Sequence, residues 1–180
     1  MVNGVADAAD TMLRLSMDAK AIVKVGPFAR GGKSRVPTIA ADHDFHPDAT
    51  VTPVGIFLPA LDELFLYGIT SKVTSDCLVD CLGRWWAVVH DRFAHLTTLV
   101  INLDNGPENH SRRTQFMQRM VDLAHHTGLT VRLASYPPSH RKDNPIERCW
   151  GILENHWHGA LRDSIDTVIP LATTRTWKGK

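Results

Sequence analysis

The sequence lacks the long apolar runs and the leader-like segments that mark membrane and secreted proteins. Its longest apolar stretches have the length of a strand, well short of the roughly 20 residues that cross a membrane. No basic and then apolar segment opens the chain, so a signal peptide is not expected. These absences favour a cytoplasmic protein with no membrane partner.

Cysteine is scarce as well. The three cysteines, Cys77, Cys81 and Cys149, form an odd set without a CxxC pair. A fold held by disulfides is therefore not expected, and a reducing compartment fits best. The ten histidines do not complete a structural zinc site with these cysteines at the usual spacing, so zinc is not expected either.

A strong excess of charge is also missing, because the formal net charge is only +1. Binding to DNA would therefore depend on local clusters of basic residues. The segment from Pro27 to Ser34 resembles a P-loop, but Pro27 stands at the first glycine position and the segment leads to Pro37 rather than to a helix. A nucleotide cofactor is not expected.

The hydrophobic pattern is regular enough to predict the order of the elements. Residues 1–12 are small and polar and are expected to be frayed, and residues 26–50 form a long loop. Period-two and period-3.6 patterns predict strands at 13–25, 51–58, 63–70, 97–103 and 129–136 and helices at 74–93, 111–127 and 145–158. This order predicts an α/β domain with a mixed five-stranded sheet flanked by helices, as in the RNase H-like (retroviral-integrase-like) fold.

Three acids stand at positions that suit chemistry, although each has a plain structural explanation. Asp18 lies on the polar side of the first strand, where it could simply face solvent on an edge strand. Asp104 ends a buried strand and opens a turn. Glu147 fits the third position of a helix capped by Asn144, with Pro145 at its first position, as in a capping box.

Taken together the three acids predict a metal site. In a sheet ordered 3-2-1-4-5, the first and fourth predicted strands are neighbours, so Asp18 and Asp104 meet, and the last helix can bring Glu147 to them. Three close carboxylates repel one another unless cations join them, and hard oxygen ligands suit Mg²⁺ or Mn²⁺. Two such ions, about 3.5–4 Å apart, support phosphoryl transfer.

Three segments resemble the catalytic blocks of DDE transposases from bacterial insertion sequences. They are SMDAKA (16–21), LDNGPEN (103–109) and SYPPSHRKDNPIERCW (135–150), and the last, with a Pro-Pro turn before Asn-Pro-Ile-Glu, is the most specific. The resemblance is closest to the ISAzo-type enzymes, whose catalytic domain is also known as the Rhodopirellula-type transposase domain. It spans roughly residues 13–178.

The resemblance implies that Asp18, Asp104 and Glu147 are the catalytic, metal-binding triad and that two Mg²⁺ or Mn²⁺ ions are the cofactors. It implies strand cleavage at transposon ends, strand transfer into target DNA, and a homodimer on DNA. We expect a single catalytic domain at 13–178, truncated, without an N-terminal helix-turn-helix region. Two alternatives stay open: a catalytically silent RNase H-like fragment that binds DNA or a partner, and a nuclease that only hydrolyses DNA.

Basic residues close to these blocks are expected to contact DNA phosphates, which position a duplex without reading its sequence. The candidates are Lys20, Lys24, Arg30, Lys33, Arg35, His140, Arg141, Lys142 and Arg148. A solvated loop is the competing interpretation for the glycine-rich segment. Asn105 and Asn144 are expected to support the acidic site from the positions beside it.

Overall fold

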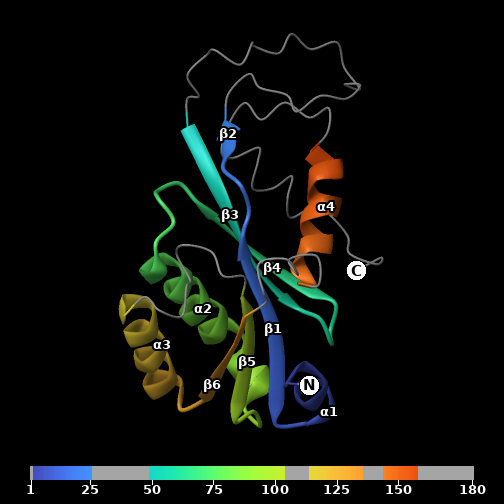
Figure 1. Cartoon of the computed structure of the whole chain (residues 1–180), viewed down its shortest axis with the longest axis vertical. Helices are drawn as coiled ribbons and strands as arrows, with labels where there is room; N and C mark the ends of the chain where they lie inside the picture. The colour runs from blue at the N-terminus through green and yellow to red at the C-terminus, as the bar shows by residue number, and fades with distance from the viewer. Residues whose placement is uncertain (1, 26–48, 104–113, 136–143, 158–180) are drawn as a thin grey trace.

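The computed structural model describes residues 2–25, 49–103, 114–135 and 144–157 (Figure 1). The elements in chain order are α1 (Val2–Ala8), β1 (Met12–Ala19), β2 (Val23–Val25), β3 (Ala49–Leu58), β4 (Glu63–Ile69), α2 (Ser75–Val89), the short 3-10 helix η1 (His90–Phe93), β5 (Thr98–Leu103), α3 (Thr114–Thr127), β6 (Thr130–Ser135) and α4 (Ile146–Trp157). Every strand and helix that the sequence predicts has a counterpart among them.

The strands form one mixed sheet with β1 in its interior. The order across the sheet is β4-β3-β1-β5-β6, which confirms the predicted order 3-2-1-4-5. β1 runs antiparallel to β3 and parallel to β5, and β5 runs parallel to β6. The strand that carries Asp18 is therefore a central strand, so the interpretation of Asp18 as an edge residue is wrong.

The sheet has six strands in the described residues, because the first predicted strand is divided. β1 ends at Ala19, and β2 resumes the pairing with β3 four residues later. At the break the backbone N–H of Lys20 donates to the carbonyl of Pro53 at 2.8 Å. Pro53 has no N–H to donate in return, so the ladder weakens at this point.

The first residues are also more ordered than the sequence predicts. Residues 2–8 form α1, which packs beside β1 with Ala6 buried. The Arg14 guanidinium donates to both carboxylate oxygens of Asp7, at 2.7 and 2.8 Å, and the Asn102 amide donates to the Asn3 side chain at 3.0 Å. The expectation of a frayed end was wrong here because tertiary contacts hold a segment that has little periodicity of its own.

Helices cover both faces of the sheet. In Figure 1, α2 and α3 lie on one side of it and α4 lies on the other. Leu13, Leu15 and Met17 of β1 belong to the core cluster beneath α2 and α3. A second cluster joins β2 and β3 to α4 and includes Phe57 and Trp150. Alternate residues of β1 therefore point to two different helix layers.

Two local features end elements as the residue types suggest. Gly128 follows α3 with a φ of 71°, the left-handed conformation that favours glycine after a helix, as predicted. Asp62, in the turn between β3 and β4, has a φ of 54°, which Asp tolerates better than most residues. β3 and β4 pair antiparallel on either side of this turn, which confirms the predicted hairpin.

Candidate active site

The polar side of β1 is covered by helices. Ser16 is paired in register with Phe57, and Asp18 with Gly55, both on β3. Because paired residues of adjacent strands share a face, and Phe57 belongs to the cluster under α4, Ser16 and Asp18 face α4. The side that the sequence marks as polar is therefore an interface between a strand and a helix.

Each alternate residue of this side has a partner on a helix or at its start. Ser16 Oγ donates to Asn144 Oδ1, and both residues are buried. Asp18 Oδ2 accepts a hydrogen bond of 2.8 Å from the indole Nε1–H of Trp150. Lys20 Nζ lies 2.8 Å from Glu154 Oε1. These three contacts thus join β1 and the residue that follows it to α4 and the segment that leads into the helix.

Trp150 is the strongest of these anchors. Its side chain is 1% exposed and lies on Gly55, where an added Cβ would stand 2.8 Å from the ring. Burial of an aromatic side chain stabilises by roughly 1.5–3 kcal/mol, and a hydrogen bond to a charged group adds about 1.5–3 kcal/mol. The ion pair of Lys20 and Glu154 is partly exposed and contributes about 0–1 kcal/mol.

Glu147 lies on the same side of α4, between the contacts to Ser16 and Asp18. It is three residues after Asn144 and three before Trp150, and residues at this spacing are neighbours on a helix surface. Glu147 is half-buried, one helical turn from the ring that bonds Asp18. The fold therefore brings two of the three predicted ligands to one region.

Asn144 has a different role from the one that the sequence suggests. The backbone N–H of Glu147 donates to the Asn144 carbonyl at 3.0 Å, so the helix does start here. The side-chain oxygen of Asn144, however, accepts from Ser16 on β1. In the described part of the chain the Asn144 side chain joins a helix end to a strand, and no capping bond from it to the first turn is present there.

Asn144 also belongs to a small buried polar cluster. Asn102 on β5 is paired in register with Ser16 and is 1% exposed. Within the described residues, Asn102 Oδ1 and Asn144 Nδ2 have no hydrogen-bond partner. One is an acceptor and the other a donor, so this cluster holds two buried polar atoms that still need a partner.

The third predicted ligand, Asp104, lies outside the described residues. β5 ends one residue earlier, at Leu103, which is paired in register with Met17. The strand end that leads into Asp104 is therefore beside the neighbour of Asp18. Asn105 and the basic residues Arg30, Lys33, Arg35, His140, Arg141 and Lys142 also lie outside the described residues.

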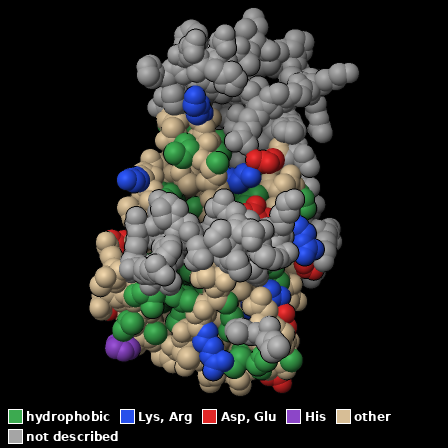
Figure 2. Space-filling model, viewed as in Figure 1, with side chains coloured by type: hydrophobic (Ala, Val, Ile, Leu, Met, Phe, Trp, Pro, Cys, Tyr) green, Lys and Arg blue, Asp and Glu red, His purple; other side chains and the backbone are tan. Residues whose placement is uncertain are grey.

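The remaining predicted DNA contacts can be placed. Lys20 is paired with Glu154, as above, and Lys24 lies on the exposed side of β2. Arg148 is exposed on α4, directly after Glu147. Figure 2 shows the Lys and Arg side chains of the described residues scattered over the visible face rather than gathered in one patch. This distribution agrees with the low net charge.

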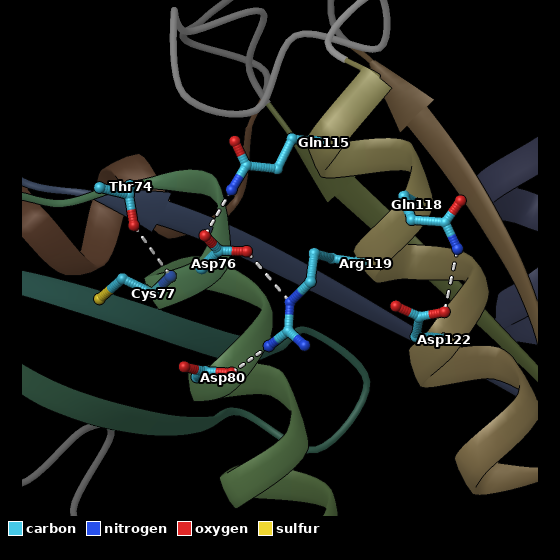
Figure 3. A network of polar contacts seen from close by, with 8 residues as sticks. All are labelled: Thr74, Asp76, Cys77, Asp80, Gln115, Gln118, Arg119 and Asp122. Atoms are coloured by element: carbon cyan, nitrogen blue, oxygen red, sulfur yellow. Dashed lines mark hydrogen bonds and ion pairs between the residues drawn. The ribbon is translucent and has the colours of Figure 1, made fainter.

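A polar network fixes the start of α3, which follows the segment that contains Asp104 (Figure 3). Gln115 Nε2 donates to Asp76 of α2 at 2.5 Å. Arg119 Nε lies 3.2 Å from Asp76, and its Nη2 donates to Asp80. These groups are partly exposed, so each ion pair is worth about 0–1 kcal/mol, and their main effect is to set the position of α3 on α2.

A cavity of about 540 Å³ opens where β1 ends, next to Asp18 in the chain. Ala19, Lys20, Thr52 and Lys72 are among the residues that line it. In the described residues, which do not include Asp104, no three His, Cys, Asp or Glu side chains gather into a group that would hold a metal. No helix in the same residues is both long and apolar enough for a membrane span.

Sequence reasoning missed Ser16, Gly55 and Trp150. Trp150 is a core residue, and its contact with Asp18 is not predicted by the hydrophobic pattern. The available signal was the indole N–H, because a buried tryptophan usually needs an acceptor. For Ser16 the available signal was its position two residues before Asp18, because residues two apart lie on the same side of a strand.

Known structures share this fold. One chain of the Mos1 transposase paired-end complex with left transposon end matches at 10% identity and a TM-score of 0.59, covering 89% of this chain and 46% of that one. The Mos1 mariner paired end complex with Mn matches at 11% identity and a TM-score of 0.57, and the match covers 89% of this chain and 47% of that one. A chain of the simian T-cell lymphotropic virus intasome in complex with the PP2A regulatory subunit B56 gamma matches at 14% identity and a TM-score of 0.55. This match covers 89% of this chain and 46% of that one. The fold is therefore RNase H-like, of the integrase type, as predicted.

The chain spans about half the length of these solved chains. No curated protein matches it. The model of the Rhodopirellula transposase DDE domain matches residues 3–180. The chain therefore belongs to the Rhodopirellula transposase DDE domain family.

Proposed function

We propose that this chain catalyses metal-dependent cleavage and strand transfer of DNA in transposition, with Asp18, Asp104 and Glu147 as the metal ligands. The observation that carries the proposal is the docking of α4 on β1. The helix contacts Asp18 through Trp150 and presents Glu147 one turn away, and β5 ends beside Met17 just before Asp104.

The donor set fits Mg²⁺ or Mn²⁺. Asp18 and Glu147 offer carboxylate oxygens, the ligands that these cations prefer. Two bound cations would activate the attacking water or 3′-hydroxyl and stabilise the leaving oxygen.

The protein's own contribution is to hold and orient. Trp150 holds one oxygen of Asp18, and Asn144 and Ser16 fix the start of the helix that carries Glu147. Arg148, His140, Arg141 and Lys142 would hold DNA phosphates beside the acids, and Arg30, Lys33 and Arg35 would extend that contact. Asn105 would support the second acid, and two chains would act together on paired DNA ends.

Nicking of supercoiled plasmid in Mg²⁺ or Mn²⁺ tests the proposal. We expect nicking by the chain and its loss to background in Asp18→Asn, Asp104→Asn and Glu147→Gln, because a neutral amide oxygen lacks the negative charge of a carboxylate and holds a divalent cation more weakly. Glu154→Gln is the matched control, since Glu154 lies on the same helix and pairs with Lys20. It should keep most of the activity.

Two results would contradict the proposal. Nicking that persists in Asp18→Asn or Glu147→Gln would reject those residues as ligands. DNA binding by the chain with no nicking in either metal would favour the silent, DNA-binding alternative. A pre-cut transposon end supplied as substrate then separates strand transfer from simple hydrolysis, because only a transposase joins that end to target DNA.

A further inference from the structure

Trp150 makes a contact that burial alone does not require. The protein contains a second fully buried tryptophan, Trp85, whose indole nitrogen has no hydrogen-bond partner in the described residues. Trp150 instead donates its N–H to Asp18 Oδ2 at 2.8 Å. The acceptor is a carboxylate on a central strand, and such charge-assisted bonds are roughly twice as strong as neutral ones.

The backbone around Asp18 is shaped to admit the ring. Gly55 is the residue paired with Asp18 across β1 and β3. A Cβ at this position would lie 2.8 Å from Cη2 of Trp150 and 2.9 Å from Cδ1 of Ile146. Glycine therefore leaves the space that the Trp150 ring occupies beside Asp18, and the indole N–H reaches the carboxylate from there.

The same ring belongs to the helix that carries Glu147. Ile146 and Trp150 are both buried against β3, and Glu147 lies between them in the sequence. A displacement of Trp150 would therefore change the orientation of Asp18 and the position of Glu147 together. The ion pair of Lys20 is instead with Glu154, and the contact of Ser16 is with Asn144.

We propose that Trp150 is a positioning residue that orients Asp18 through its indole N–H and ties that carboxylate to the helix of Glu147, with Gly55 providing the space. This inference rests on the proposed function, since it treats Asp18 as a metal ligand. Trp150 takes no part in the chemistry itself. Its effect is to hold Asp18 in one rotamer before any cation binds, which lowers the cost of ordering the site.

The test compares Trp150→Phe with Trp85→Phe. Both changes keep an aromatic ring in a buried site, but only the first removes a hydrogen bond that the structure shows. Mn²⁺ affinity is measured directly by electron paramagnetic resonance of free Mn²⁺, and unfolding by urea is followed in parallel. We expect Trp150→Phe to weaken Mn²⁺ binding by about 10–100-fold, and Trp85→Phe to leave it unchanged.

A second readout does not depend on the folding of that variant. In ¹⁵N spectra the Trp150 indole N–H signal, assigned by elimination with phenylalanine variants of the other four tryptophans, should shift in Asp18→Asn. The Trp85 signal should not move. An unchanged Trp150 signal would overturn the inference, because the bond to the carboxylate would then not exist in solution.

The outcomes separate this inference from the proposed function. If Asp18→Asn abolishes Mn²⁺ binding while Trp150→Phe leaves the affinity within twofold of wild type, Asp18 is a ligand and the positioning role is rejected. If Asp18→Asn also leaves the affinity unchanged, the proposed metal site itself is wrong. Weakened binding in both variants, with Trp85→Phe unaffected, supports both.

Discussion

At the scale of single residues, the three cysteine side chains differ in how deeply they are buried. Cys81 and Cys77 lie one turn apart on α2, yet Cys81 is buried and Cys77 is half-buried. Burial raises the pKa of the Cys81 thiol to about 12, with a further contribution from Cys77, and burial does the same for Cys149 on α4. Two of the three thiols are therefore held in the neutral form.

These thiols should report on unfolding. Their folded pKa lies above the unfolded value, so the unfolded chain releases protons first and the free energy of unfolding should fall as pH rises from about 9 to about 12. At pH 8 we expect Cys77 to react quickly with a disulfide reagent and Cys81 and Cys149 to react slowly. All three should react at one rate in denaturant.

Removal of Cys77 provides the control for this measurement. The variant Cys77→Ala should lose the fast phase and keep two slow thiols. Equal rates for all three thiols in the native protein would show that α2 and α4 do not bury Cys81 and Cys149 as the structure has them.

At the scale of elements, the contact of α4 with β1 and β3 depends on a glycine. Gly55→Ala should destabilise the protein by about 1–3 kcal/mol, because the new methyl group overlaps Trp150 and Ile146 in a packed layer. Gly151→Ala, on the exposed side of α4 with no atom near its Cβ, should instead stabilise by about 0.5–1 kcal/mol. Urea unfolding of the two variants measures both.

The opposite signs of these two changes make the comparison informative. A stable Gly55→Ala variant with unchanged unfolding would mean that α4 does not pack on β3 in solution. The contacts of Ser16, Asp18 and Lys20 with α4 and the residue before it would then lose their common support.

At the scale of the whole molecule, much of the fold could be predicted from the sequence, because periodicity reports which side of an element is buried. Along β1 the apolar residues Leu13, Leu15 and Met17 lie in the core as the alternation predicts, whereas the polar side is covered by α4. The break before β2 was missed because its cause, Pro53, lies on a different strand. α1 was missed because its stability comes from contacts with Arg14 and Asn102.

The candidate site could be predicted less completely, and the reason is physical. Asp18 and Glu147 can be recognised as candidate oxygen ligands from their residue type and from the residues next to them in the sequence. The residues packed around Asp18, Trp150 and Gly55, come together only through the packing of a helix on two strands far away in the chain. A buried tryptophan looks like a core residue until the acceptor of its N–H is known.

The most direct test of the proposed metal site is the anomalous scattering of Mn²⁺ in crystals of the protein grown with that ion. We expect anomalous peaks within about 2.6 Å of carboxylate oxygens of both Asp18 and Glu147, with Asp104 completing the site. Peaks that touch only one of these acids, or none, in a crystal where the protein is folded and the metal is in excess, would contradict the claim that α4 and β1 together build a metal-binding active site.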